Sequence, residues 1–381
     1  LPYVRAEGKA GRLGSTLLAV VAEGNRQRIY LPATDEHRTT ADVLAPDDLP
    51  PGDLGYDPRA ITAPNYGMTK FTDLFTNRQL IALTTFSDLV GEARSQVTAD
   101  GASLSYADAV TTYIGLTVSR TADLMNSIVT WSSSRDQARN LFARQAIPMV
   151  WDYVEVNPFG GAAGDVGVGL DTAVKALQNA AEFGLPAVVK QADADSRTYR
   201  NVLISTDPPY YDNIGYADLS DFFYVWLRRS LREVHPDLLS TMLVPKGEEL
   251  VANPFRQGGQ MEAKEFFEAG FRHVFAKARE SALTDHPITI YYAFKQSDTD
   301  DAGEASSGWE TLLEGVIRSG WAISSTWPLR SERGGRMRDI DSNALASSIV
   351  LSLRPRPDDA LTTDRRGFIA ALEAELPGAL R

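Results

Sequence analysis

The chain has 381 residues, of which 43% are hydrophobic and 23% charged, and its formal net charge is −12. This composition is typical of a soluble globular protein, and no apolar run approaches the ~20 residues of a membrane span, so no membrane partner is expected. The absence of cysteine excludes disulfides and thiolate metal sites and fits a cytoplasmic protein. The acidic balance excludes a generally basic nucleic-acid-binding surface, although a local basic patch needs only a few Lys or Arg.

Residues 1–67 are predicted to form a β-hairpin followed by an extended surface connection. Two apolar runs, 17–22 and 28–30, flank a turn at Gly24-Asn25. Residues 33–67 are rich in Pro, Asp and Thr, a composition that is typical of a long connection. Because the chain begins with Leu1 rather than Met, we expect either that its start has been removed or that it is a portion of a longer protein.

Residues 68–146 are predicted to form a helical region. Leu80, Leu83 and Phe86 recur at helical spacing behind a cap at Thr76 or Asn77. A second helix is predicted from Ser103 or Ser105, with an inner face made of Val110, Tyr113, Ile114, Thr117 and Thr121, and a third over residues 135–144. These apolar stripes predict a layer of helices that pack against one another. This interpretation is favoured over a role in binding a cofactor.

Residues 147–381 are predicted to form an α/β domain. The expected strands are 147–156, 187–189, 202–204, 287–294, 321–327 and 345–353, and the expected helices are 170–183, 218–232, 263–283, 309–318 and 368–376. The alternation of strands and helices from Ala187 onward favours a parallel sheet, with the last two strands able to pair as a hairpin. The stretch 298–307 is expected to be an acidic surface loop.

The tetrad Asp207-Pro208-Pro209-Tyr210 follows the strand predicted at 202–204. Ligands of open α/β sheets bind beyond the carboxyl ends of the strands, so this turn stands where chemistry is expected. Asp207 can accept one N–H of an exocyclic amine, and a carbonyl before or between the prolines can accept the other. Tyr210 offers a flat face on which a flipped base can stack. The alternative is a structural turn in which Asp207 caps the next segment.

The tetrad resembles motif IV of S-adenosylmethionine-dependent amino-methyltransferases, mainly adenine-N6 DNA methylases. The wider run 205–229 is similar to one group, large prokaryotic adenine-specific DNA methylases with an N-terminal domain of unknown function, which sometimes lie near phage-defence genes. Segments 142–159, 291–296 and 342–351 resemble the same group. The resemblance covers most of the chain.

This resemblance implies a Rossmann-like class I methyltransferase sheet with a reversed final strand, S-adenosyl-L-methionine as methyl donor, and double-stranded DNA with a flipped base as partner. It also implies an Asp-Pro-Phe-x-Gly-x-Gly motif on the first strand, which this sequence lacks. In the family the donor-binding glycines lie far upstream. The sheet is therefore expected to be incomplete in this chain, with its first strands before Leu1. The missing N-terminal part of the same protein is then an expected partner.

Two stretches are candidates for binding the donor. Asn157, Phe159 and Gly160 lie in an Asn-Pro-Phe-Gly-Gly turn that imitates the family motif without its acidic start, and a structural turn is the alternative. Asp193 and Asp195, after the strand predicted beside that of the tetrad, resemble the acidic residue that contacts the donor's adenosine. Exposed turn carboxylates are the alternative for this pair.

The candidates for binding the nucleic acid follow the tetrad or lie far downstream. Tyr211 and Asn213 belong to the family-like run, and Arg333 and Arg336 lie in a glycine-flanked basic loop that suits phosphate contacts. Surface salt bridges are the alternative for these loop arginines. A solvated helix face is the simpler interpretation of Arg228, Arg229 and Arg232. The four histidines show no HxxxH or HExxH spacing, so no metal site is predicted.

The sequence therefore favours an adenine-specific DNA methyltransferase and leaves two alternatives open. In the first alternative, the chain is a catalytically incomplete fragment or a degenerate relative that lacks the donor site and has a role in binding or assembly. Methylation of RNA or of cytosine N4 is the other alternative, and the aspartate in place of serine in the tetrad favours adenine by resemblance.

Overall fold

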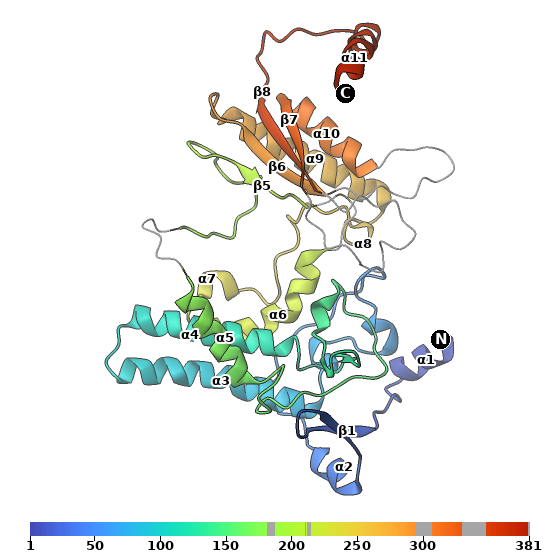
Figure 1. The fold of residues 1–381 in the computed structure, drawn as a ribbon, viewed down its shortest axis with the longest axis vertical. Helices are drawn as coiled ribbons and strands as arrows, with labels where there is room; N and C mark the ends of the chain where they lie inside the picture. Colours follow the sequence, from blue (N-terminus) through green and yellow to red (C-terminus); the bar gives the residue numbers. More distant parts are fainter. Residues whose placement is uncertain (181–186, 210, 212–214, 294–306, 330–347, 380–381) are drawn as a thin grey trace. The chain divides into compact units, whose positions relative to one another are not determined.

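A computed structural model shows a mixed α/β protein and describes residues 1–180, 187–209, 211, 215–293, 307–329 and 348–379 (Figure 1). The described residues form 11 α-helices, a mixed sheet of four strands and two small two-stranded sheets. They group into two compact units, residues 1–191 with 214–249 and residues 192–213 with 250–381. Each unit has its own hydrophobic core. These units differ from the predicted division at residues 67 and 146.

The first unit is mainly helical. In chain order it contains α1 (Pro2–Lys9), β1 (Ala19–Glu23), β2 (Arg28–Pro32), α2 (Asp35–Ala41), α3 (Asn77–Ala99), α4 (Leu104–Ala122), β3 (Trp131–Ser132), β4 (Gln137–Ala138), α5 (Val166–Gln178), α6 (Tyr216–Leu231) and α7 (Pro236–Leu239), with short 3-10 helices at Ala63–Tyr66, Phe71–Leu74 and Leu141–Ala143. β1 and β2 pair antiparallel, which confirms the predicted hairpin.

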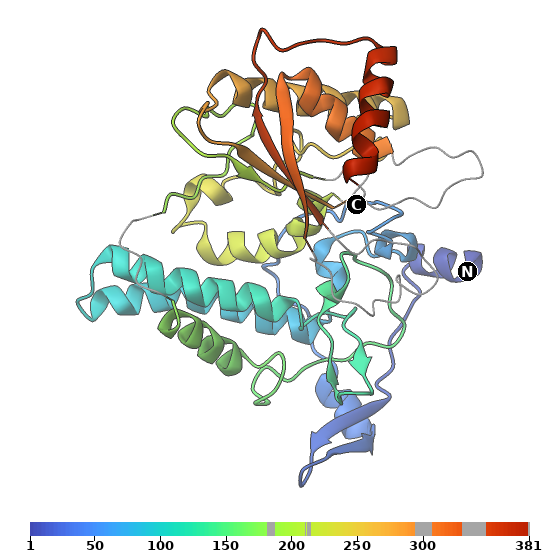
Figure 2. The ribbon, with the colours of Figure 1, turned by 45° about the horizontal axis from the view of Figure 1, so that its top comes forward.

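Local capping explains why α3 and α4 begin where the sequence predicted. The Thr76 hydroxyl accepts the N–H of Gln79, and the Gln79 side chain accepts the N–H of Thr76 in return. The Ser103 hydroxyl accepts the N–H of Tyr106 at the start of α4. The two helices run side by side with α5 along α4, as Figure 2 shows.

The first core lies where α3 and α4 contact α6. Gly115 of α4 allows a close approach, because a Cβ there would come within 2.7 Å of Leu231. Phe222 and Trp226 of α6 are fully buried, and their rings lie 5.7 and 5.3 Å from that of Phe75. α6 therefore belongs to the helical unit, although the sequence predicted it as part of the α/β domain.

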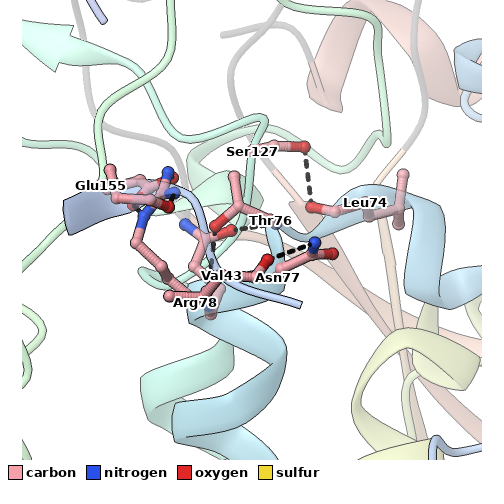
Figure 3. A network of polar contacts seen from close by, with 9 residues as sticks. Val43, Leu74, Thr76, Asn77, Arg78, Ser127 and Glu155 are labelled. Atoms are coloured by element: carbon pink, nitrogen blue, oxygen red, sulfur yellow. Dashed lines mark hydrogen bonds and ion pairs between the residues drawn. The ribbon is translucent and has the colours of Figure 1, made fainter. Parts of the chain in front are cut away.

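A polar network fastens the start of α3 to segments far away in the sequence (Figure 3). Arg78 forms a two-pronged ion pair with Glu155 at 2.6 and 2.8 Å and donates to the carbonyl of Ala41. The Asn77 side chain donates to the carbonyl of Val43 at 2.8 Å. Part of the segment predicted as a surface connection is thus held against the helices.

The second unit contains the four-stranded sheet. In chain order it comprises β5 (Ser205–Thr206), α8 (Pro254–Gln257), α9 (Gln260–Glu280), β6 (Ile288–Ala293), α10 (Ser307–Arg318), β7 (Trp321–Leu329), β8 (Ser348–Pro355) and α11 (Arg365–Ala379). α10 ends at Arg318, and Gly320 two residues beyond takes a φ of +83° in the left-handed region, between the helix and β7. The helices expected around α9, α10 and α11 are confirmed.

The strand order is β5-β6-β8-β7. β5 is parallel to β6, whereas β8 is antiparallel to both of its neighbours, β6 and β7. β5, β6 and β7 consequently point the same way, and the last strand in the chain lies reversed between β6 and β7. The predicted pairing of the last two strands is confirmed, and the sheet is mixed rather than wholly parallel.

The second core lies between this sheet and the helices α9 and α10. Phe267, Phe271 and Phe275 follow one another at four-residue spacing on α9, and consecutive ring centroids are 5.0 Å apart. The Trp321 indole N–H donates to the carbonyl of Phe275 at 2.9 Å, which ties the start of β7 to α9. Buried strand residues Ile290, Tyr292, Leu351 and Leu353 complete this core.

Several predicted elements are wrong. Residues 135–144 form β4 and a 3-10 helix rather than an α-helix, because Asp136 takes a left-handed φ of +47° in a turn. The strands predicted at 147–156 and 187–189 do not form, and Val188 and Val189 are 79% and 94% exposed. β5 starts at Ser205, after the apolar run 202–204, and has only two residues.

Two further boundaries differ. The predicted surface connection 33–67 includes α2, and Leu54, Ala60, Ile61 and Ala63 within it are buried in the first core. α5 begins four residues before the predicted start at Leu170, because the Asp165 carboxylate caps it by accepting the N–H of Val168.

Candidate functional site

The Asp207 turn begins where β5 ends. Thr206 pairs with Ile290 of β6, and Asp207, Pro208 and Pro209 follow directly. Asp207 is exposed, whereas the two prolines are half-buried. Since β5 is parallel to β6, the turn lies at the carboxyl end of the parallel strands, as the sequence predicted.

Three contacts hold the chain immediately beyond the tetrad. The N–H of Tyr211 donates to the Tyr292 hydroxyl at 3.5 Å, and the carbonyl of Tyr211 accepts the N–H of Ala252 at 3.0 Å. The Tyr211 ring meets the Phe267 ring edge-on, with centroids 5.3 Å apart. Tyr211 therefore anchors the turn to the second core, and its predicted contact with substrate stays a prediction.

Tyr292 brings a buried hydroxyl to this turn. Its side chain is 2% exposed, and burial raises the pKa of its hydroxyl above the ordinary value of 10.0, while the N–H of Tyr211 opposes that rise. The hydroxyl stays protonated at neutral pH and accepts from the backbone. Tyr292 lies in the family-like segment 291–296, but nothing local in β6 indicates its contact with Tyr211, 81 positions away in the chain.

The carboxyl ends of β6 and β7 lie at the same edge of the sheet as the Asp207 turn. Ser348, the first residue of β8, is in register with both Ala293 at the end of β6 and Leu329 at the end of β7. The chain between Leu329 and Ser348 carries the candidates Arg333 and Arg336. These two arginines, together with Tyr210 and Asn213, lie outside the described residues.

Asp193 and Asp195 belong to the same unit as the Asp207 turn, in a loop held by α9. The Asp193 carboxylate accepts the N–H groups of Asp195 and Ser196 at 3.0 and 3.1 Å, so it closes a local turn. The Asp195 carboxylate lies 3.0 Å from Nδ1 of His273, and Lys277 donates to the Asp195 carbonyl. His273 and Lys277 share one face of α9, but their sequence spacing alone does not reveal which loop they meet.

Asn157, Phe159 and Gly160 lie in the first unit instead. The Asn157 side chain accepts the N–H of Phe159 at 3.0 Å, and its carbonyl accepts the N–H of Gly160 at 3.1 Å. Phe159 is 77% exposed, and its ring lies 5.9 Å from that of Phe86. The turn ends at Asp165, where the N–H groups of Gly161 and Val168 lower the pKa of the carboxyl. The described residues 147–156, directly before this turn, form no strand.

The arginines of α6 are partly engaged within the first unit. Arg229 forms two hydrogen bonds with the Asp88 carboxylate, both at 3.0 Å, and an ion pair with Asp48 at 3.0 Å. This internal pairing fits a structural role for Arg229.

Asp221 is a buried carboxylate for which the sequence predicted no role. It accepts the N–H of Val244 at 2.8 Å and lies 2.7 Å from Nζ of Lys246. Burial raises the pKa of Asp221, and the contacts with Lys246 and Val244 oppose the rise. It fastens the segment after α7 to α6, which is a structural role.

Within the described ranges, no group of three or more histidine and acidic side chains is placed to hold a metal ion. None of the helices in these ranges combines the length and apolarity needed to cross a membrane. Comparisons of the chain with protein-family models, with curated proteins and with solved structures found no match.

Proposed function

We propose that the Asp207 turn binds the exocyclic amino group of a nucleic-acid base, adenine N6 in DNA, for methylation by S-adenosylmethionine. The observation that carries this proposal is the Asp-Pro-Pro sequence at the carboxyl end of β5, in a sheet whose final strand is reversed between β6 and β7. That strand order is compatible with the Rossmann-like methyltransferase sheet that the sequence resemblance implies.

The chemistry asks for hydrogen-bond acceptors rather than donors. A conjugated amine is a poor nucleophile, and its lone pair must be turned towards the methyl group while both N–H bonds are held. The Asp207 carboxylate accepts one N–H, and a carbonyl next to Pro208 accepts the other. The carboxylate would also stabilise the positive charge that develops on the nitrogen as the nitrogen–carbon bond forms and the donor's sulfur–carbon bond breaks, which turns the sulfonium into a neutral thioether. One N–H proton would then leave to water.

The anchoring of Tyr211 supports this role, because a turn that aligns an amine must itself be held. Hydrogen bonds to Tyr292 and Ala252, together with the ring of Phe267, fix the residue next to Tyr210. In the proposal Tyr210 stacks on the flipped base. Arg333 and Arg336, in the connection from β7 to β8, contact DNA phosphates.

Asp195 is the described carboxylate in the second unit that best fits the methyl donor. Its side chain is 38% exposed and points to His273 rather than into its own backbone, whereas Asp193 already accepts two backbone N–H groups. A carboxylate of this kind can accept hydrogen bonds from ribose hydroxyls. When bound, S-adenosylmethionine supplies the methyl group; Asn157, Phe159 and Gly160 belong to the other unit and remain weaker candidates.

The test is transfer of a radiolabelled methyl group to unmethylated DNA by the protein as it is made in the cell, followed by nucleoside analysis. We expect N6-methyladenine, and we expect it to be lost in Asp207→Ala. Unchanged methylation in that variant would contradict the role of Asp207. Label in cytosine, or in RNA only, would replace the proposed substrate by one of the two alternatives.

A second candidate function rests on β5, which has β6 on one side and no partner strand on the other within the described ranges. The donor-binding strands that the resemblance implies would pair with this edge. In that case the chain binds the base and assembles with a donor-binding segment, but does not transfer methyl groups alone. Isothermal titration with S-adenosylmethionine separates the two functions, because micromolar binding excludes the second and absence of binding excludes the first for this chain.

A further inference from the structure

α11 is exposed along almost its whole length. Every residue from Arg365 to Gly378 except Gly367 is exposed, and none belongs to either hydrophobic core. Four of these residues are large and apolar, namely Phe368, Ile369, Leu372 and Leu376, which are 59%, 42%, 47% and 46% exposed. A helix with this much uncovered apolar surface is typical of an interaction element.

The apolar residues form one stripe. Ile369, Leu372 and Leu376 follow one another at intervals of three and four residues, the spacing of the seam in a coiled coil, with Phe368 beside them. Arg365 continues the seam one step towards the N-terminus, where its aliphatic stem can cover a neighbouring apolar side chain. The stripe therefore suits a second helix laid along it.

The charges of α11 are divided between its two ends. Arg365 and Arg366 lie in its first turn, and Glu373 and Glu375 lie in its second half, so the two arginines balance the two glutamates within the helix. A surface hollow next to Ile369 is lined by both Arg366 and Glu373. An antiparallel second helix of the same sequence brings its own Glu373 towards Arg366 and its own Arg366 towards Glu373.

We propose that α11 pairs with α11 of a second copy of this chain, in antiparallel orientation. When Ile369 of one copy lies level with Leu372 of the other, Arg366 and Glu373 flank the seam as two symmetric ion pairs. A two-fold axis satisfies both copies with the same residues, which is the property of an isologous interface. Because the helix is locally neutral, this contact forms although each chain carries a net charge of −12.

The size of the helix sets the strength of the association. α11 has 15 residues, which corresponds to a length of about 22 Å. An interface of this length is small compared with that of an obligate dimer. The dimer is therefore expected to be weak and to dissociate on dilution through the micromolar range.

Sedimentation velocity of the full chain over a range of concentrations tests the proposal. We expect a monomer–dimer equilibrium in the wild type and a rise of about 100-fold or more in the dissociation constant of Leu372→Asp, since an unpaired charge is then buried in the seam. Ala374→Asp adds the same charge on the opposite face of the helix and should leave the dimer intact. Circular dichroism should be unchanged in both variants, because α11 contributes to neither core.

A charge exchange makes the test specific for pairing between two copies. Arg366→Glu and Glu373→Arg, each alone, should weaken the dimer, whereas an equimolar mixture of the two variants should restore it as a heterodimer. The proposal is overturned if the wild type is monomeric up to about 100 μM, a concentration at which even a small specific interface should associate. It is also overturned if Leu372→Asp dimerises like the wild type, or if the mixture fails to associate.

Discussion

Two proline-containing turns of this chain look alike in sequence but are built differently. Asn157-Pro158-Phe159 in the first unit is closed by its own atoms, because the Asn157 side chain accepts the N–H of Phe159. Asp207-Pro208-Pro209 in the second unit follows a strand that is paired with β6, and the chain beyond it is held from β6, α9 and Ala252. The first turn is a local connection, and the second is a supported strand end.

A turn therefore becomes a candidate site through the elements that surround it. An Asn or Asp before proline supports a local turn on its own. Only a turn that is fixed from several elements can hold two acceptors in a constant geometry towards a substrate.

The aromatic contacts of the two turns should differ most. Phe267 is fully buried and contacts the Tyr211 ring, so Phe267→Ala should lower the free energy of unfolding by about 4 kcal/mol. Phe159 is 77% exposed, so Phe159→Ala should cost no more than about 0.5 kcal/mol. Urea unfolding of both variants measures this. Equal losses of unfolding free energy in the two variants would contradict the claim that the Asp207 turn is held more firmly than the Asn157 turn.

Tyr292→Phe should remove the hydroxyl that accepts the N–H of Tyr211 and should lower the free energy of unfolding by about 1 kcal/mol. If the proposed activity is present, kcat should fall while the KM for the methyl donor stays constant, since the change loosens only the turn. Tyr291→Phe, at the neighbouring position of β6, is the matched control. A larger fall in unfolding free energy or in kcat for Tyr291→Phe than for Tyr292→Phe would contradict the role of Tyr292 in holding the turn.

Asp165→Ala should remove the N-terminal cap of α5, the helix that follows the Asn157 turn. It should lower the free energy of unfolding by about 1 kcal/mol near neutral pH. The pKa of Asp165 is lowered in the folded state, so its stabilisation is present above the ordinary value of 3.8 and is lost as the pH falls through the folded pKa. The difference between wild type and variant should therefore shrink in acid. Asp171→Ala, an exposed change in the same helix, is the control, and a difference that grows on acidification would refute this role.

The sequence predicted the elements whose signals are local. α3 and α4 carry their own caps at Thr76 and Ser103, and α9 repeats its phenylalanines at helical spacing, so their existence and approximate limits could be inferred. The hairpin of β1 and β2 was predictable because a tight turn at Gly24-Asn25 links the two strands. The pairing of β7 with β8 was predictable because strands that follow one another in the chain commonly pair, although residues 330–347 separate these two.

Two of the wrong predictions, the strands at 147–156 and 187–189, concern apolar runs that lack a partner strand. Val188 and Val189 favour a strand by propensity, but no strand of the described residues pairs with them, and propensity alone does not form a sheet. The same limit applies to the site. The sequence predicted a site at Asp207, Pro208 and Pro209, whereas the contacts of Tyr211 with Tyr292, Phe267 and Ala252 join positions that are distant in the chain and carry no local signal.

One methyl-transfer assay on DNA compares the two turns directly, with Asp207→Ala and Asn157→Ala measured beside the wild type. We expect Asp207→Ala to lower the rate by roughly 100-fold or more, because it removes an acceptor aimed at the developing charge, while Asn157→Ala stays close to the wild type. A normal rate in Asp207→Ala, or an equal loss in both variants, would contradict the assignment of the Asp207 turn as the amine-binding site.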